Sequence, residues 1–217
     1  MEIDMRRSLR SLVVAALILA IGTGLHAPAS AQPDLLARMI ALNPGLKSYT
    51  AAIHADVHMT SFPYLNPVLD GTYYHKDPSK DKIVFTSGLP GIAKQFSKIY
   101  PRIAEPVSWK TVYIVTQGAS QGGATTFTLV PRKHGRVDHI DVVVDDATAT
   151  IRSMKWNYND GSGYAELHQT YTKVGDDYLV SAQTGHVEQS IYKADIDSTF
   201  ASFQLNAPIA DSFFADN

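Results

Sequence analysis

The sequence predicts a mainly-β protein of about ten antiparallel strands, with helices only near its start. Apolar and polar residues alternate along Tyr49–Thr60, as in a strand with one buried face. Turn-forming residues recur at short intervals through the rest of the chain, and the segments between them alternate in the same way. Helical periodicity is confined to two short segments, Pro33–Gly45 and Gly88–Pro101.

The N-terminal segment Met1–Ala31 is expected to be a signal peptide that is cleaved after Ala31. Basic residues precede the apolar run Leu12–Ile21, and Ala29 and Ala31 supply the small side chains of a cleavage site. The run is shorter than the roughly 20 residues that a membrane-spanning helix needs. We therefore predict an exported, periplasmic protein in which the segment from Gln32 to Asn217 forms a single domain. A retained N-terminal anchor is the alternative.

The charge balance and the lack of cysteine argue against a nucleic-acid-binding protein and against a lipoprotein. The chain has 19 Lys and Arg against 21 Asp and Glu, and the segment Met1–Ala31 holds three of the basic and two of the acidic ones. The predicted mature chain therefore has 16 basic and 19 acidic side chains, without a basic stripe. Nucleic acid is accordingly not an expected partner. Because the chain has no cysteine, it has neither disulfides nor the acylated cysteine of bacterial lipoproteins.

Two helices are predicted. The first, of about three turns within Pro33–Gly45, has one apolar face and ends at a turn-forming Asn-Pro-Gly. The second, within Gly88–Pro101, interrupts the strands and is bounded by prolines near both ends. We expect this second helix to be a lid rather than a fixed part of the core.

The remaining segments are predicted as strands, separated by turns such as Asn159–Gly163. The predicted strands are Tyr49–Thr60, Leu69–Pro78, Lys82–Ser87, Trp109–Gly118, Ala124–Arg132, Arg136–Asp145, Thr148–Tyr158, Tyr164–Val174, Tyr178–Ser190 and Ala194–Asn206. Asp145, Asp146, Asp176 and Asp177 fall in or beside predicted turns, where solvated aspartates are common.

The stretch His54-Ala-Asp-Val-His58 offers the ligand types that zinc takes, but its predicted geometry argues against a metal site. With a rise of ~3.3 Å per strand residue, its two histidines lie about 13 Å apart, too far for one ion to bridge. Both also fall on the polar face of the strand. The other histidines are scattered, without metal-ligand spacing: His75, His134, His139, His168 and His186. No nucleophile or phosphate-loop motif is present. We predict no metal, no cofactor, no catalytic residue, and a protein that is not an enzyme.

Several stretches together resemble the LolA-like family of periplasmic outer-membrane lipoprotein carriers. Leu69–Phe85 is similar to the family's second and third strands, and Asp138–Gly163 to its central hairpin and the following turn. Ser198–Phe214 is similar to its closing strand and short tail. The resemblance extends over residues 34–214. It implies a strongly curved antiparallel sheet, an incomplete half-open β-barrel, covered by short helices.

The resemblance also implies that the apolar space between the sheet and a helical lid holds acyl chains. The apolar faces of the predicted elements supply the candidate lining residues. These are Leu36, Met39, Ile40, Ile53, Val57, Met59, Tyr73, Phe85, Leu89, Ile92, Phe96, Tyr113, Val142, Met154, Trp156 and Phe203. The same side chains would equally suit an ordinary filled core.

The expected function is that of a soluble exported carrier or sensor for lipid, lipoprotein acyl chains or a similar hydrophobic ligand. We expect a monomer, with an inner- or outer-membrane protein as a possible further partner. The alternative is an envelope hydrolase or metal-dependent enzyme whose polar residues converge from separate strands. A third interpretation is a protein that binds partner chains at a sheet edge. Co-purifying acyl chains would indicate the carrier, and a stoichiometric metal ion the enzyme.

Overall fold

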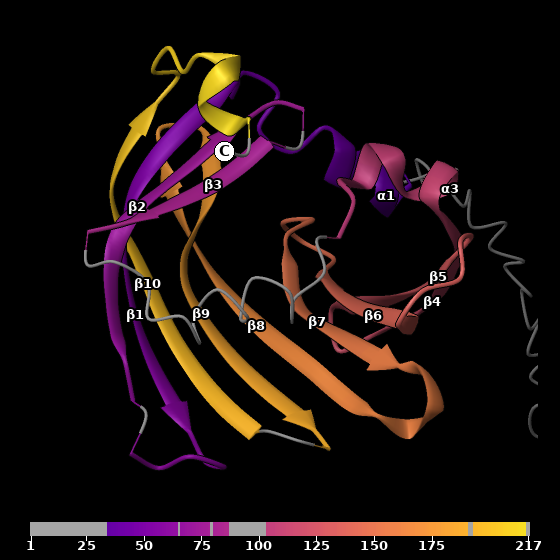
Figure 1. Ribbon diagram of the computed structural model, residues 1–217. Helices are drawn as coiled ribbons and strands as arrows, with labels where there is room; N and C mark the ends of the chain where they lie inside the picture. Colours follow the sequence, from indigo (N-terminus) through magenta and orange to yellow (C-terminus); the bar gives the residue numbers. More distant parts are fainter. Residues whose placement is uncertain (1–33, 65, 79, 87–102, 191–192, 216–217) are drawn as a thin grey trace, which may run out of the picture. The chain divides into compact units, whose positions relative to one another are not determined.

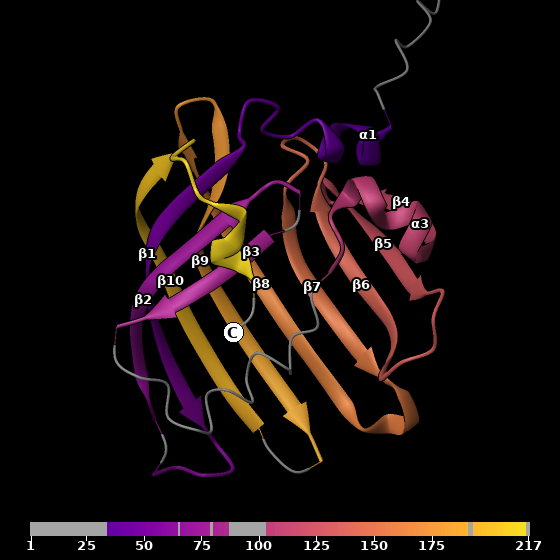
Figure 2. The ribbon, with the colours of Figure 1, turned by 45° about the horizontal axis from the view of Figure 1, so that its top comes forward.

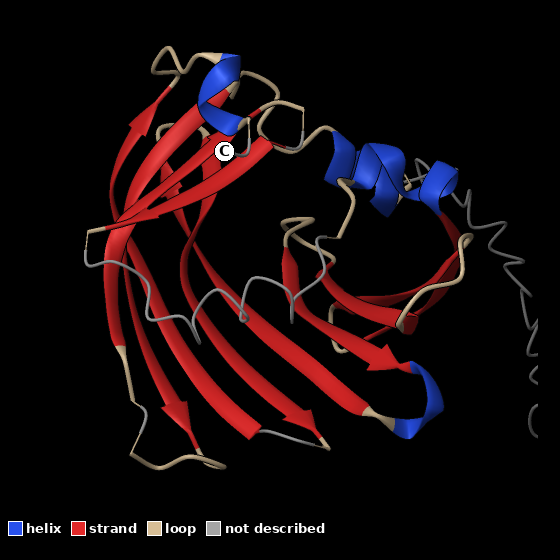
Figure 3. Ribbon diagram, viewed as in Figure 1, coloured by secondary structure: helices blue, strands red, loops and turns tan. Residues whose placement is uncertain are grey.

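The computed structural model of the protein describes residues 34–64, 66–78, 80–86, 103–190 and 193–215. Its main feature is one sheet of ten antiparallel strands, which confirms the predicted fold class. The strands are β1 (Ser48–Met59), β2 (Val68–Lys76), β3 (Lys80–Phe85), β4 (Tyr113–Gln121), β5 (Ala124–Pro131), β6 (Val137–Asp145), β7 (Ile151–Tyr158), β8 (Gly163–Val174), β9 (Asp177–Gln189) and β10 (Lys193–Leu205). Figure 3 shows how strongly strands dominate the chain.

The sheet is curved and does not close. Its strand order is β3-β2-β1-β10-β9-β8-β7-β6-β5-β4, so every neighbouring pair except β1 and β10 is consecutive in the chain. β3 and β4 are the two edges, and the strands between them bend into an open half-barrel (Figure 1). Because β3 and β4 are consecutive in the chain but lie at opposite edges, the segment between them connects the two edges.

β1 illustrates how the sequence produces this sheet. From Ala51 to Met59 every second residue is buried and every intervening residue is exposed, as the predicted alternation requires. His54 and His58 are on the exposed face, so the prediction that this stretch is a strand with outward histidines is confirmed. On its two sides β1 pairs with β2 and β10, which places Asp70 opposite His54 and Asp195 opposite His58.

Short helices accompany the sheet: α1 (Leu35–Ile40), α3 (Trp109–Val112), and the 3₁₀ turns η1 (Pro106–Ser108), η2 (Asn159–Gly161) and η3 (Asp211–Phe214). Figures 1 and 2 both place α1 and α3 beside the part of the sheet formed by β4 and β5. Within the described residues, no helix is long and apolar enough to cross a membrane. The predicted helix within Gly88–Pro101, with its role as a lid, lies outside the described residues.

The first helix is shorter than predicted. Asp34 caps it by accepting a hydrogen bond from the Leu36 backbone N–H at 3.3 Å, but the helix ends at Ile40, before the predicted stop at Asn43-Pro-Gly45. Asn43 adopts a left-handed conformation, with a φ of 60°. Its amide donates to the Tyr178 carbonyl at 2.9 Å and accepts from the Tyr178 N–H at 2.8 Å. This pairing fixes the chain to the start of β9, so the segment leaves the helix early.

The prediction that a strand begins at Trp109 is wrong. Residues Trp109–Val112 form α3, and β4 begins at Tyr113. The Trp109 side chain is fully buried, its Nε1 donates to the Ala104 carbonyl at 2.6 Å, and its ring meets that of Phe127 edge-on at 5.6 Å. Burial of the indole and satisfaction of its N–H outweigh the local preference for a strand.

Buried apolar side chains form two clusters. The larger cluster packs α1 and α3 against the β4–β9 part of the sheet: Leu35, Leu36, Met39, Trp109, Tyr113, Phe127, Leu129, Ile140, Val142, Val144, Ala149, Met154, Trp156, Tyr158, Ala165 and Val187. The smaller cluster joins β1, β2 and β10: Ala55, Val57, Met59, Leu69 and Ala194. The helices are therefore held on one half of the sheet by a continuous apolar core.

Candidate functional site

The concave face of the sheet and the segment before β4 border a cavity of about 880 Å³. This volume lies in the range of about 300–1,000 Å³ that is usual for small-molecule pockets. Its lining is mainly apolar and aromatic: Met39, Ile40, Leu42, Leu46, Tyr49, Tyr73, Ile103, Val107, Val112, Tyr113, Ile151, Met154, Tyr171, Tyr178, Leu179 and Val180. A smaller cavity, of about 550 Å³, lies beside residues 206–210, and neither aromatic side chains nor carboxylates line it. The larger cavity is therefore the candidate site.

Some of the residues predicted to line a cavity border this one. They are Met39 and Ile40 from α1, Tyr73 from β2, Tyr113 from β4 and Met154 from β7. These elements are distant in the sequence, and the curvature of the sheet brings them around one space.

The other predicted lining residues that the structure describes do not border this cavity. Leu36, Val142 and Trp156 belong to the larger packed cluster, whereas Val57, Met59 and Phe85 belong to or pack against the smaller one. Ile53 is buried, and Phe203 packs against Tyr49 with ring centroids 6.4 Å apart. Leu89, Ile92 and Phe96 lie outside the described residues. Apolar periodicity alone does not distinguish a residue that borders a cavity from one that fills a core.

Sequence reasoning did not select several residues that border the cavity, among them Leu179 and Val180 of β9. A strand directs consecutive side chains to opposite faces, so a period of two assigns only one of these neighbours to the cavity. The pairing of β8 with β9 shifts in register beside Tyr171, next to these residues. Such a bulge re-aims side chains and has no clear signal in the alternation.

One corner of the cavity is polar. His75 of β2 is opposite Asp81 of β3, and Tyr73 shares a face with His75 because it lies two positions earlier on the same strand. The His75 Nδ1 is 2.7 Å from Asp81 Oδ1, and the Tyr73 hydroxyl donates to the same oxygen at 2.6 Å. The His75 side chain is 18% exposed. Cross-strand pairing therefore orients the imidazole within the corner.

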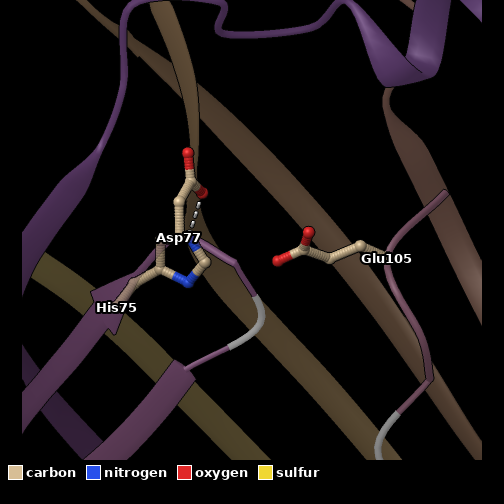
Figure 4. A group of neighbouring side chains, drawn as sticks. All are labelled: His75, Asp77 and Glu105. Atoms are coloured by element: carbon tan, nitrogen blue, oxygen red, sulfur yellow. Dashed lines mark hydrogen bonds and ion pairs between the residues drawn. The ribbon is translucent and has the colours of Figure 1, made fainter. Parts of the chain in front are cut away.

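Two further carboxylates approach His75 from different parts of the chain. Asp77 Oδ1 lies 3.4 Å from His75 Nε2. Glu105 precedes η1, and Figure 4 shows its carboxylate pointing toward His75 and Asp77 from the opposite side. One ligand atom from each of these three side chains lies within 4.8 Å of the other two. No sequence pattern connects the three, because Glu105 reaches the corner only through the segment that joins the two sheet edges.

The segment that carries Glu105 is anchored. The Ala104 N–H donates to the Tyr113 hydroxyl at 3.2 Å, and its carbonyl accepts from Trp109 Nε1 at 2.6 Å. The Glu105 carbonyl accepts from the Ser108 N–H at 2.8 Å. Helix α3, which was predicted as part of a strand, therefore helps to position Glu105. Its Trp109 indole holds the carbonyl of the preceding residue, Ala104.

The titration of this corner follows from burial and from its carboxylates. Burial raises the pKa of Tyr49 to about 12, and the nearby Asp81 adds to the increase while a hydrogen bond with Tyr73 opposes it. Burial likewise raises the pKa of Tyr73 and Tyr171 well above the ordinary value. Burial lowers the pKa of His75, but its hydrogen bonds to Asp81 and Asp77 outweigh that effect and raise the pKa overall. The tyrosines therefore stay neutral near pH 7.

The arrangement combines two chemical environments. The apolar walls favour hydrocarbon over water, and the polar corner offers carboxylates and an imidazole to a cation or a hydrogen-bond donor. Such a division suits a ligand with an apolar body and a polar end.

The fold of this chain is similar to those of several solved structures. No protein-family model and no curated protein matches the sequence. A DUF1329 family protein from Desulfovibrio piger matches with a TM-score of 0.63 at 11% identity, covering 84% of this chain and 95% of its own. A putative outer membrane lipoprotein-sorting protein domain from Vibrio parahaemolyticus gives 0.62 at 10% identity, covering 83% and 94%.

A LolA superfamily protein from Nitrosomonas europaea matches with a TM-score of 0.52 at 7% identity, covering 84% of this chain and 96% of its own. All three matches extend over most of both chains, so they concern the whole curved sheet. At such low identities they establish architecture only. The chain has a LolA-like fold.

Proposed function

We propose that the protein is an exported carrier or sensor that binds a lipid, an acylated protein or a similar hydrophobic ligand in the 880 Å³ cavity. The observation that carries this proposal is the apolar and aromatic lining of a cavity of ligand size within a LolA-like fold. Each methylene group that moves from water into such surroundings contributes about 0.8 kcal/mol. An acyl chain is therefore the ligand type that this lining stabilises most.

Further features support export and a carrier role. The basic residues, apolar run and small-residue site within Met1–Ala31 have the pattern of a cleaved signal peptide. One of the similar structures is described as a putative outer membrane lipoprotein-sorting protein domain, which supports a carrier over an enzyme. We expect a monomer in solution, with an envelope protein that delivers or accepts the ligand.

A chain-length series of fluorescent fatty-acyl probes tests the proposal. If the chain is buried in the cavity, removing two methylenes raises the dissociation constant about fifteenfold, which corresponds to about 1.6 kcal/mol. This dependence holds until the chain exceeds the length of the cavity. Affinity that does not change with chain length would contradict the proposal.

A pair of variants tests where the probe binds. Ile40 borders the cavity and is 48% exposed, so Ile40→Asp introduces a charge at the wall with little effect on the core. Ile114 on β4 is 54% exposed and does not border the cavity, so Ile114→Asp is the matched control. We expect at least tenfold weaker binding for the first variant and unchanged binding for the second, because a carboxylate beside hydrocarbon is costly. Equal effects of both substitutions would place the probe elsewhere.

A further inference from the structure

Four of the histidines that the structure describes each lie between two carboxylates. His54 has Asp70 at 2.7 Å and Asp56 at 3.4 Å from its two ring nitrogens. His139 and His186 have similar pairs of acidic neighbours. His75 repeats the arrangement, with Asp81 at 2.7 Å from Nδ1 and Asp77 at 3.4 Å from Nε2. Such a pair alone is therefore a common surface feature of this sheet.

His75 differs from the others by a third carboxylate and by its surroundings. Glu105 approaches from the opposite direction (Figure 4) and brings a ligand atom to within 4.8 Å of those of His75 and Asp77. Among the residues that the structure describes, no other three such side chains converge in this way. The His75 side chain is also 18% exposed, against 49% for His54. The corner around His75 therefore has one carboxylate more than the surroundings of His54, and its imidazole is less accessible to water.

We propose that His75, Asp77 and Glu105 bind a divalent cation of the zinc type at the polar corner of the cavity. Ligand atoms about 2.1 Å from a tetrahedral ion lie roughly 3.4 Å from one another. The separation of 3.4 Å between His75 Nε2 and Asp77 Oδ1 already matches this spacing. The Glu105 ligand atom lies within 4.8 Å of the other two, so binding of the ion requires its carboxylate to move inward.

The contacts behind His75 have the form expected of a metal ligand. A metal-bound histidine usually donates its second ring N–H to a carboxylate, which fixes the tautomer and the ring orientation. Here Asp81 accepts that hydrogen bond from Nδ1 and is itself bound by the Tyr73 hydroxyl. In the neutral imidazole that binds a metal, the proton would stay on Nδ1 toward Asp81, and the ion would take the place of the Nε2 proton that faces Asp77. Asp77 is also held through its backbone, whose N–H donates to the Lys47 carbonyl at 3.0 Å.

The ligand set indicates the class of ion. One imidazole with two carboxylates suits zinc and related transition metals, whereas magnesium prefers oxygen ligands in a regular octahedron. Three protein ligands leave at least one coordination position open. All three side chains border the cavity, so this position is accessible to water or to an oxygen atom of a bound molecule.

Isothermal titration of the metal-free mature protein with Zn²⁺ tests the proposal. We expect one ion per chain and at least tenfold weaker binding of Mg²⁺. His75→Ala should abolish the site, and Glu105→Gln should weaken it at least tenfold. Asp81→Asn should weaken it about 10- to 100-fold, the usual effect of removing the carboxylate behind a metal-bound histidine.

The control is His54→Ala, which removes a histidine with the same two distances but no third carboxylate. We expect it to leave the stoichiometry and affinity for Zn²⁺ unchanged. Thermal melting of each variant without metal establishes that the fold is intact. A stoichiometry that His75→Ala and Glu105→Gln do not alter, or one that His54→Ala lowers, would overturn the proposal. Because these titrations contain no acyl ligand, their outcome is independent of the proposed carrier function.

Discussion

The turn between β6 and β7 allows a quantitative prediction. The sequence assigns Asp145 to a turn with solvated aspartates, but the structure gives its carboxylate, 20% exposed, a set of specific partners. Oδ1 accepts from the N–H groups of Ala147 and Thr148 at 2.9 and 2.8 Å, and Oδ2 accepts from Arg152 Nε at 3.0 Å. Burial raises the pKa of Asp145, but Arg152 and these N–H groups outweigh that effect and lower it to about 2.

A pKa that is lowered from 3.8 to about 2 corresponds to about 2 kcal/mol of stability. We therefore expect Asp145→Asn to lower the melting temperature at neutral pH by about 4–8 °C. Because the folded pKa is lower than the unfolded one, this contribution is complete above the unfolded value of 3.8 and is lost as the pH falls through about 2. The deficit of the variant should therefore be constant at neutral and mildly acidic pH and should shrink below pH 3.8.

Melting curves of the wild type and the variant across this pH range are the assay. Asp176→Asn is a matched control, because Asp176 lies in the turn between β8 and β9 and its carboxylate has no comparable contacts within the described chain. A variant at Asp145 that melts like the wild type at neutral pH would show that the Asp145 charge does not stabilise the fold. A deficit that persists unchanged in strong acid would show the same, because the cause would then not be the charge.

Three other substitutions or measurements test separate parts of the account. A Cβ atom at Gly163 would lie 1.9 Å from the Glu188 carbonyl oxygen at a φ of 116°, so Gly163→Ala should destabilise by about 2 kcal/mol or more, whereas Gly135→Ala should be neutral by denaturant unfolding. Trp109→Ala should cost about 3–5 kcal/mol in the same assay, because it empties a fully buried site; a loss below about 1 kcal/mol would contradict its role in the core. Intact-mass analysis of exported protein should give an N-terminus at Gln32, and a mass that includes Met1–Ala31 would contradict cleavage.

The sequence contained enough information for the sheet because each strand is long and has one buried face. The alternation in Tyr49–Thr60, for example, fixes both the strand and the direction of its histidines. The sequence did not contain enough information to predict where the helices begin and end. The first helix stops early because Asn43 pairs with Tyr178, a contact 135 residues away in the chain. Trp109 begins a helical turn because its indole N–H donates to the Ala104 carbonyl in the preceding segment. Local strand and helix propensities do not include such a contact.

The candidate site was less predictable than the fold, for two physical reasons. Whether an apolar side chain fills a core or borders a cavity depends on how strongly the sheet curves, which no single strand reveals. The polar corner depends on the connection between opposite sheet edges, which brings Glu105 to His75. His54 and His58 are close in sequence, but their side chains are not brought together by the strand that carries them. His75 is the one that meets a third carboxylate, through contacts that sequence spacing does not encode.

Photo-crosslinking shows directly whether an acyl chain occupies the cavity. The protein is incubated with a long-chain fatty acid that carries a diazirine near its end, irradiated, digested and mapped by mass spectrometry. We expect labelled peptides that contain the cavity residues Tyr171 and Leu179, with labelling reduced in Ile40→Asp and retained in Ile114→Asp. Labelling confined to the exposed face of the sheet, or labelling that Ile40→Asp does not alter, would contradict binding of the acyl chain in the cavity.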